Sequence, residues 1–275
     1  MKQTDLNRIY SIINDKLRTA WKSYTELDNW YQVFVSVALS RLHIRQRPFR
    51  IVSRSGVTLL TPAQTEAYSS FFEVFVWDAY RIKDVNWKKP EMSRLVLDVG
   101  AHIGSFTCTL ASLLPGASFV CVEPSASSTK WLQRNLELNQ LTRRSTVISA
   151  AVTSVDGPVT LWGAGELSSG NSLNAPGSAW KQTDVTGLSI DSLFSRLERL
   201  PDIVKLDCEG GEYDAILGGH AELWKDTNHL FLEYHRGRFS ELVNRIGEFG
   251  LRLVWHEQNA RHEGIGMAYF NRNVR

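Results

Sequence analysis

Cysteine, net charge and long hydrophobic runs are all scarce in this 275-residue sequence. Its three cysteines form no Cys-X-X-Cys pair, which argues against a disulfide framework and favours a reducing compartment. The formal net charge of +2 is too small for a nucleic-acid binder that depends on bulk charge. The longest early apolar run, Val33–Leu39, cannot span a bilayer, and residues 1–30 are too polar for a signal peptide. These absences predict a cytoplasmic protein with no membrane span and no nucleic-acid partner.

What the chain has is an ordinary globular composition with an uneven distribution of charge. Hydrophobic residues make up 43% of the sequence and charged residues 22%, which suits one large domain or one domain with an appendage. Residues 1–55 contain ten Lys or Arg residues and four acids, a charge of +6, so residues 56–275 carry −4. Such charges usually lie on a solvated helix face. Four clustered arginines nevertheless suggest a lid over an anionic small-molecule acceptor: Arg41, Arg45, Arg47 and Arg50.

Residues 1–90 are expected to form a helical cap. Apolar residues at helical spacing predict two helices between residues 4 and 45, with a stripe made of Leu6, Ile9, Ile12, Ile13, Leu17 and Trp21. Pro48 ends this run, and alternation around Ser55-Gly56 predicts a β-hairpin over residues 49–60. A third helix is predicted from Pro62 or Thr65 to Tyr80. The N-terminal helices are also the expected surface for a homo-oligomer.

After Pro90 the predicted strands and helices alternate. Strands are expected over residues 95–99, 118–123, 146–152, 202–207 and 229–234, with helices over 104–114, 127–139, 189–200, 212–218 and 239–249. Two further strands, 251–256 and 266–271, are expected to pair antiparallel, and residues 159–162 to form a small antiparallel strand. Alternation of this kind is typical of βαβ units. Residues 91–275 are therefore predicted to form an α/β domain with a doubly wound, mostly parallel seven-stranded sheet.

The first of these strands leads into a glycine-containing turn, Asp98-Val-Gly-Ala-His-Ile-Gly-Ser-Phe106, at the edge of the sheet where ligands bind in such folds. Gly100 and Gly104 allow a tight turn and a close approach of backbone to ligand, and Ser105 can begin the next helix. The spacing does not match the nicotinamide fingerprint, and the Gly-Lys-Ser/Thr of a phosphate loop is absent. Asp98 would repel a pyrophosphate but attract an ammonium group.

Glu123 ends the second predicted strand, 19 residues after Gly104. An acid at this place in a nucleotide-binding βαβ unit accepts hydrogen bonds from ribose hydroxyls. Alone, Glu123 would be interpreted as a solvated acid at a strand end. Together with Asp98 and the glycine turn, it predicts a site for a nucleoside that carries a diol and an amine.

Charged residues also gather where the fourth and fifth predicted strands end. Lys205, Asp207 and Glu209 alternate at strand spacing, and Glu233 and His235 end the next strand. A purely structural interpretation is that Lys205 neutralises one of the acids. The functional interpretation is a catalytic rim in which His235 accepts a proton. So many charges at one edge favour the functional interpretation.

Together these segments resemble the FkbM family of S-adenosylmethionine-dependent methyltransferases, within the class I Rossmann-like group. The resemblance runs in family order over about residues 70–275. It rests on Val96–Phe106, Val122-Glu-Pro124, Leu132 to Asn139 with its paired asparagines Asn135 and Asn139, Ala150–Val152, Leu188–Leu193, Ile203–Glu212 and Leu232–His235. His102 stands where the family usually has Asn, and residues 1–65 lie outside the resemblance.

The resemblance implies S-adenosylmethionine as cofactor and O-methylation of a sugar or another small metabolite, as in natural product biosynthesis. It implies that the cofactor is bound by Asp98, Gly100, Ala101, His102, Gly104, Ser105, Glu123, Pro124, Ala150, Ala151, Val152 and Asp207. Within this set Glu123 would hold the ribose, and residues 150–152 would lie near the adenine. The catalytic candidates are Asp207, which would approach the reacting methyl group, and Glu209 or His235 as the base.

Three alternatives stay open on the sequence. Asp207, Glu209 and Glu233 would suit a divalent cation that binds an acceptor diol, although a metal is not favoured. The cofactor motifs fit methylation of a nitrogen or a carboxylate as well as a hydroxyl. A catalytically silent subunit that binds a partner through its basic N-terminus is the third alternative, but such a subunit does not need the acidic rim.

Overall fold

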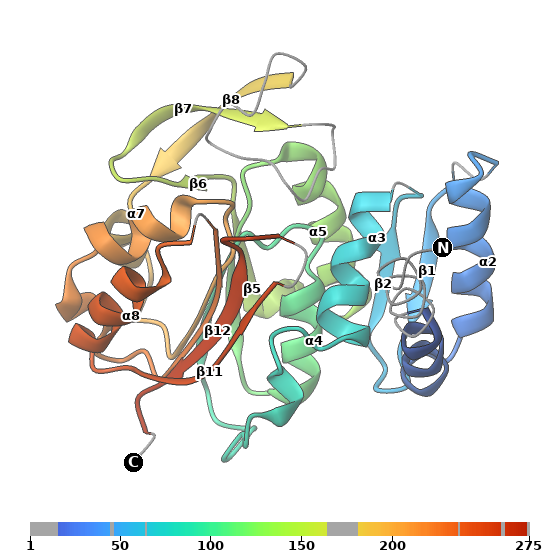
Figure 1. Ribbon diagram of the computed structural model, residues 1–275, viewed down its shortest axis with the longest axis horizontal. Helices are drawn as coiled ribbons and strands as arrows, with labels where there is room; N and C mark the ends of the chain where they lie inside the picture. The colour runs from blue at the N-terminus through green and yellow to red at the C-terminus, as the bar shows by residue number, and fades with distance from the viewer. Residues whose placement is uncertain are drawn as a thin grey trace, which may run out of the picture.

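The computed structural model describes residues 16–44, 47–63, 65–163, 181–235, 237–259 and 262–273. Its centre is a seven-stranded sheet in the order β11-β12-β10-β9-β3-β4-β5 (Figure 1). The strands are β3 (Leu95–Val99), β4 (Ser118–Val122), β5 (Ser145–Ile148), β9 (Ile203–Leu206), β10 (His229–Tyr234), β11 (Arg252–Gln258) and β12 (Gly266–Asn271). Five of them run parallel, whereas β12 pairs antiparallel with both β10 and β11. The predicted doubly wound, mostly parallel sheet is thus confirmed.

The central strands contribute to two hydrophobic cores, because successive side chains of a strand point to opposite faces. Val96 and Phe119 belong to one core, and Leu97 and Val120 to the other. Helices α4 (Ser105–Leu113) and α5 (Ala126–Leu138) cover the first, while α6 (Ile190–Ser195), α7 (Gly211–Gly218) and α8 (Phe239–Glu248) cover the second. Both faces of the sheet are therefore buried at its central strands, whereas the edge strand β11 is largely exposed.

The N-terminal segment forms a further layer against α4 and α5 (Figure 1). It consists of a helix over residues 16–26, α2 (Trp30–Arg41), the hairpin β1 (Phe49–Val52) and β2 (Thr58–Thr61), α3 (Thr65–Phe71), the π-helix η1 (Phe72–Val76) and the 3-10 helix η2 (Ile82–Asp84). Phe71, Phe75 and Tyr80 of this segment belong to the same hydrophobic core as Phe106 of α4. The core therefore runs across the boundary predicted near residue 90.

Two asparagines of α5 attach the predicted hairpin, which is confirmed, to the rest of the molecule. The Asn135 side chain accepts from the Leu60 amide (2.7 Å) and donates to the Leu60 carbonyl (3.1 Å). Asn139 does the same with the Thr58 amide (2.9 Å) and carbonyl (2.6 Å). Residues four apart on a helix rise about 6 Å, close to the roughly 6.6 Å between residues two apart on a strand. The two amides therefore pair with the free edge of β2 as a neighbouring strand would.

Several predicted boundaries are wrong. The single strand expected over residues 146–152 is two strands, of which β6 (Ala151–Val152) belongs to a separate sheet with β7 (Gly157–Gly163) and β8 (Lys181–Leu188). Strand β8 was not predicted, because its sequence is mostly polar. The helix expected over residues 189–200 ends at Ser195, and the third N-terminal helix ends at Val76 in a π-turn. Tyr80 therefore lies outside a helix, and its side chain reaches the edge of the main sheet.

The described part of the N-terminal helices is less buried than their spacing predicts. Leu17 and Trp21 are 63% and 67% exposed, so they do not form a buried stripe. The remaining members of the stripe lie outside the described residues: Leu6, Ile9, Ile12 and Ile13. A homo-oligomer through this surface stays a prediction.

The structure also bears on the predictions about a membrane span and about the cysteines. Over the described ranges, no helix has the length and apolar character needed to cross a bilayer. Cys108, Cys121 and Cys208, which are all the cysteines of the chain, are free thiols.

Candidate active site

A cavity of about 280 Å³ opens at the carboxyl ends of the parallel strands, where ligands bind in open α/β sheets. The glycine turn after β3 contributes Gly100 and His102, and the end of β4 contributes Glu123 and Pro124. The remaining predicted residues that line the cavity are Ala150, Ala151 and Val152 before and within β6, Asp207 and Glu209 after β9, and His235 after β10. The tertiary structure thus gathers predicted cofactor and catalytic residues around one space.

Four predicted cofactor residues do not line the cavity: Asp98, Ala101, Gly104 and Ser105. Packing within the protein explains why glycine is needed at positions 100 and 104. A Cβ atom on Gly100 would lie 1.7 Å from the Asp207 carbonyl oxygen, and one on Gly104 would lie 2.9 Å from a methyl carbon of Leu132. Both glycines also have positive φ, at 76° and 89°. The close approach that each glycine permits is therefore to the protein itself.

Asp98 was predicted to attract the ammonium of a ligand, but it faces an ammonium of the protein. The side chain is fully buried, accepts a hydrogen bond from the Thr107 hydroxyl (2.6 Å) and lies 3.4 Å from Lys205 Nζ. Lys205 Nζ is also 3.3 Å from Asp207 and donates to the Gly100 carbonyl (2.7 Å). Burial alone would lower the pKa of Lys205, but Asp207 and Asp98 raise it above its usual value. A charged lysine thus joins β9 to the glycine turn.

Asp207 is held by groups from two parts of the chain. Besides the ion pair with Lys205, its carboxylate accepts a hydrogen bond from the Tyr80 hydroxyl (2.6 Å). Burial would raise the pKa of Asp207, but Lys205 and Tyr80 favour the charged form and hold the pKa below its usual value. Sequence reasoning missed Tyr80, which approaches from 127 residues away in the chain.

Glu123 is almost fully buried at the end of β4. One carboxylate oxygen accepts from the amide of His102 and the other from the amide of Ser125, each at 2.9 Å. Burial raises the pKa of Glu123 to about 7, although the two amides act in the opposite direction. The backbone of the glycine turn therefore aligns this carboxylate, and its charge changes near neutral pH.

His235 and Glu209 form an acid–base pair in the cavity wall. His235 Nε2 lies 3.4 Å from Glu209, and Nδ1 lies 3.0 Å from the buried carboxylate of Glu212. Burial would lower the pKa of His235, but Glu212 and Glu209 raise it to about 9. Burial raises the pKa of Glu209 to about 7, against the effect of His235. At neutral pH the imidazole is therefore protonated and the Glu209 carboxylate is close to its titration midpoint.

Two more acids reach the cavity, and only one of them was a candidate. Glu233, expected as part of the charged rim and as a possible cation ligand, lies near the end of β10, whereas Glu73 comes from η1 and was missed. Burial and Asp207 together raise the pKa of Glu73 to about 7 and that of Glu233 well above its usual value. Nothing in the local sequence distinguishes Glu73 from an ordinary exposed helix acid. Only the packing of the N-terminal layer brings it here.

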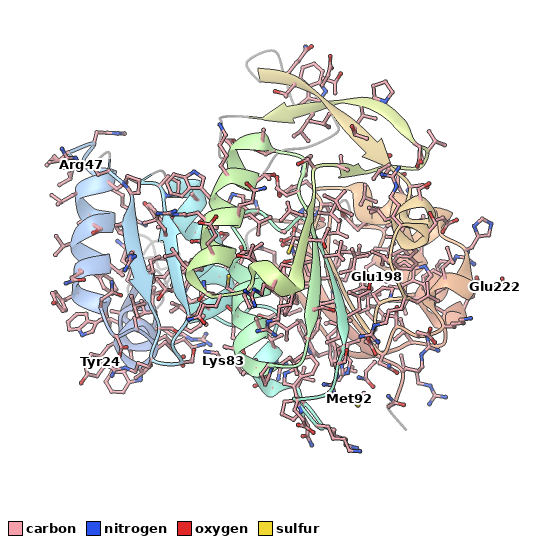
Figure 2. The ribbon with its side chains drawn as sticks, turned by 180° about the vertical axis from the view of Figure 1, so that it is seen from behind. Tyr24, Arg47, Lys83, Met92, Glu198 and Glu222 are labelled. Carbon is pink, nitrogen blue, oxygen red and sulfur yellow. The ribbon has the colours of Figure 1, made fainter. Side chains whose placement is uncertain are left out.

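The N-terminal arginines do not take part in this cavity. Arg41, Arg47 and Arg50 are exposed, and no Lys or Arg among the described residues lines the cavity. Arg47 lies at the outer end of the N-terminal layer (Figure 2). Arg45 is outside the described residues. Among the described residues, these arginines therefore do not form the predicted lid over the cavity.

The arrangement of the acids bears on the divalent-cation alternative. In the ranges that the structure describes, no group of three or more His, Cys, Asp or Glu side chains is placed to hold one metal ion. Asp207 is engaged by Lys205 and Tyr80, and Glu209 by His235. The geometry thus gives no support to Asp207, Glu209 and Glu233 as a shared ligand set.

Comparison with known proteins gives a family match and distant structural likenesses. The family model described as the methyltransferase FkbM domain matches residues 98–253. Among solved structures, the chain is similar to the M. jannaschii tRNA m1G37 methyltransferase (12% identity, TM-score 0.49, 84% of this chain and 59% of that one). It is also similar to the METTL16 methyltransferase domain (14% identity, TM-score 0.47, 87% of this chain and 80% of that one). A third similar structure is P. horikoshii TYW2 in complex with MeSAdo (13% identity, TM-score 0.43, 82% of this chain and 71% of that one). Likenesses at these identities concern the fold alone. No curated protein sequence matches the chain.

Proposed function

Because the chain belongs to the FkbM methyltransferase family, we propose that it transfers the methyl group of S-adenosylmethionine to a hydroxyl group of a small molecule. One observation carries the proposal: a single cavity is lined by both groups that this reaction needs. The first is an aligned acid at the end of β4, suited to a ribose. The second is the Glu209–His235 pair, suited to removing a proton from an acceptor.

The residues around the cavity fit this cofactor. Each oxygen of Glu123 accepts one backbone amide and keeps a lone pair for a ribose hydroxyl. Residues 150–152 give a small apolar wall for the adenine. When bound, S-adenosylmethionine supplies a methyl group on a positively charged sulfur.

Glu209 is the better of the two predicted bases. A group can accept a proton only in its deprotonated form, and a base works best when its pKa lies near the working pH. His235, with a pKa of about 9, is already protonated at pH 7, whereas Glu209 has a pKa of about 7. We assign to Glu209 the removal of the hydroxyl proton and to His235 the orientation of Glu209. A positioned base of this kind accelerates proton removal by about 10²–10⁴-fold.

Asp207 has a positioning role in this proposal. Its carboxylate is fixed by Tyr80 and Lys205, and its pKa is held below the usual value, so it stays ionised at neutral pH. A carboxylate with a lowered pKa is a weak proton acceptor, so we do not assign the removal of the hydroxyl proton to Asp207. Asp207 instead places the loop that carries Glu209.

Calorimetric titration with S-adenosylmethionine tests the cofactor site. We expect wild type to bind and Glu123→Ala to bind about tenfold more weakly or worse, because hydrogen bonds to a charged group contribute roughly 1.5–3 kcal/mol. Glu198→Ala is the matched control, since Glu198 is an exposed acid that does not line the cavity (Figure 2). Folded wild type that does not bind the cofactor would contradict the proposal.

Transfer of a labelled methyl group to a panel of hydroxylated small molecules tests the chemistry. We expect Glu209→Gln to lower kcat by about 10²-fold or more while cofactor binding is kept. Labelling of amino or carboxyl groups alone would contradict a hydroxyl acceptor and leave the methyltransferase activity standing.

A further inference from the structure

Most acids at the cavity have a partner of their own. Asp207 has Lys205 and Tyr80, and Glu209 has His235. Glu123 is held by two backbone amides. Glu73 and Glu233 differ from these three. Within the described ranges, neither side chain has a hydrogen bond or an ion pair, although both line the cavity.

Strand register places Glu233 beside Asp207 at the end of the sheet. Leu232 of β10 pairs with Leu206 of β9, which pairs with Val99 of β3. The next residues on the three strands, Glu233, Asp207 and Gly100, therefore lie at one level across the end of the sheet. Glu73 approaches the same space from a different layer, in the π-helix η1 that packs against α4. Short π-helical segments frequently occur at functional sites.

Two half-buried carboxylates without a cation are costly in the free protein. Glu73 and Glu233 raise each other's cost, since their charges repel one another and that of Asp207. Lys205 and His235 offset only part of this cost, because Lys205 is shared by two aspartates and His235 by two glutamates. A ligand that brings a positive charge removes the repulsion, whereas an anionic ligand increases it.

We propose that Glu73 and Glu233 bind a protonated amine of the acceptor, so that the substrate of this enzyme is a hydroxylated small molecule that carries an amino group. The inference rests on the methyltransferase function proposed above and names its substrate class. It replaces the anionic acceptor expected from the N-terminal arginines, of which Arg41, Arg47 and Arg50 do not line the cavity. Glu73 gives the N-terminal layer a direct part in substrate choice.

Binding of matched small molecules to the complex with S-adenosylhomocysteine tests the inference without turnover. The probes are two triplets, 4-aminocyclohexanol with 1,4-cyclohexanediol and 4-hydroxycyclohexanecarboxylate, and tyramine with tyrosol and 4-hydroxyphenylacetate. Each triplet compares a cation, a neutral molecule and an anion on one scaffold. Calorimetry at about pH 8 keeps Glu73 ionised.

We expect at least one amine to bind with a dissociation constant of about 1 mM or tighter, and about tenfold tighter than its neutral and anionic partners. Glu73→Gln with Glu233→Gln is expected to remove that preference and to leave affinity for S-adenosylhomocysteine unchanged. Glu222→Gln is the control, because Glu222 is an exposed acid on another surface (Figure 2).

Three results would overturn the inference. One is a neutral or anionic partner that binds as tightly as its amine, and another is the absence of binding by both amines. The third is an equal loss of S-adenosylhomocysteine affinity in the double variant, which would assign the two acids to the amine of the cofactor. Failure of wild type to bind S-adenosylhomocysteine at all would instead count against the proposed methyltransferase function.

Discussion

At the scale of single residues, two residues of the candidate site have an unusual backbone conformation. His102 and Glu209 have φ values of 49° and 53°, a region that non-glycine residues seldom adopt. Such conformations cost roughly 1–3 kcal/mol each and persist where their surroundings hold them. The amide of His102 bonds to Glu123, and Gly210, which follows Glu209, bonds to Glu212. The strained backbone therefore lies at the turn that binds Glu123 and at the loop that carries Glu209.

Cofactor binding should depend on pH through Glu123. The carboxylate form accepts hydrogen bonds from ribose hydroxyls, and its pKa is about 7, so protonation below pH 7 removes the binding form. We expect affinity for S-adenosylmethionine to fall by up to about tenfold per pH unit below that pKa. Calorimetry on wild type and Glu123→Gln between pH 5.5 and about 8 checks this. Parallel profiles for the two proteins would show that another group is responsible.

Gly100 is expected to tolerate no side chain. Gly100→Ala places a Cβ atom 1.7 Å from the Asp207 carbonyl and at a φ of 76°. We expect a loss of about 3 kcal/mol or more in the free energy of unfolding, measured by urea denaturation. Gly247→Ala is the matched control: it lies in α8 with nothing within 4 Å of its added Cβ, and should gain up to about 1 kcal/mol. Equal effects of the two changes would contradict the packing argument.

At the scale of elements, side chains of one helix complete the edge of a strand. Asn135 and Asn139 of α5 occupy the backbone groups of Leu60 and Thr58 that a third hairpin strand would otherwise take. Asn135 also donates to the Ile103 carbonyl (2.8 Å), in the glycine turn. One buried amide therefore connects the hairpin, α5 and the cofactor loop.

Removal of that amide should destabilise the protein strongly. Asn135→Ala leaves the amide and carbonyl of Leu60 and the carbonyl of Ile103 without this partner. Because each unsatisfied buried group costs about 1–3 kcal/mol, we expect a loss of roughly 3 kcal/mol in urea denaturation. The control is Asn244→Ala, at an exposed position of α8, which should change stability by less than about 0.5 kcal/mol. A loss below about 1 kcal/mol at Asn135 would show that the hairpin is held by other contacts.

At the scale of the whole molecule, the N-terminal layer and the sheet share one core. Phe71, Phe75 and Tyr80 pack in the same cluster as Phe106 and Phe231 of the methyltransferase part. The ring of Tyr80 lies edge-on to Phe106, with centroids 5.4 Å apart, while its hydroxyl bonds to Asp207. The N-terminal layer thus contributes to the core on one face of the sheet and also supplies two groups at the site, Tyr80 and Glu73.

A chain that begins at residue 91 is therefore expected not to fold on its own. Without residues 1–90, apolar surface on α4, α5 and β10 is exposed to water, and exposed apolar area of this kind is destabilising. We expect loss of near-ultraviolet circular dichroism and of a cooperative thermal transition, with the full chain as control. A cooperative transition in the shortened chain would establish residues 91–275 as an independent domain.

The sequence by itself determined the alternation of strands and helices and the position of the glycine turn. It also predicted that Glu123, Asp207, Glu209 and His235 meet at one edge. These follow from local information: side-chain periodicity, glycine at positions of positive φ, and the rule that parallel strands end on the same side of a sheet. The FkbM resemblance added the cofactor, and the family match agrees with it.

Only the tertiary structure decided which charges are paired and which are left for a ligand. Lys205 pairs with Asp98 and Asp207, and Glu212 pairs with His235. Glu73 reaches the cavity from a helix that lies more than a hundred residues before Asp207 in the chain. Periodicity carries no information about such contacts, because they join segments that are distant in sequence. Burial then sets the pKa values, so the choice of Glu209 over His235 as base depends on the folded chain.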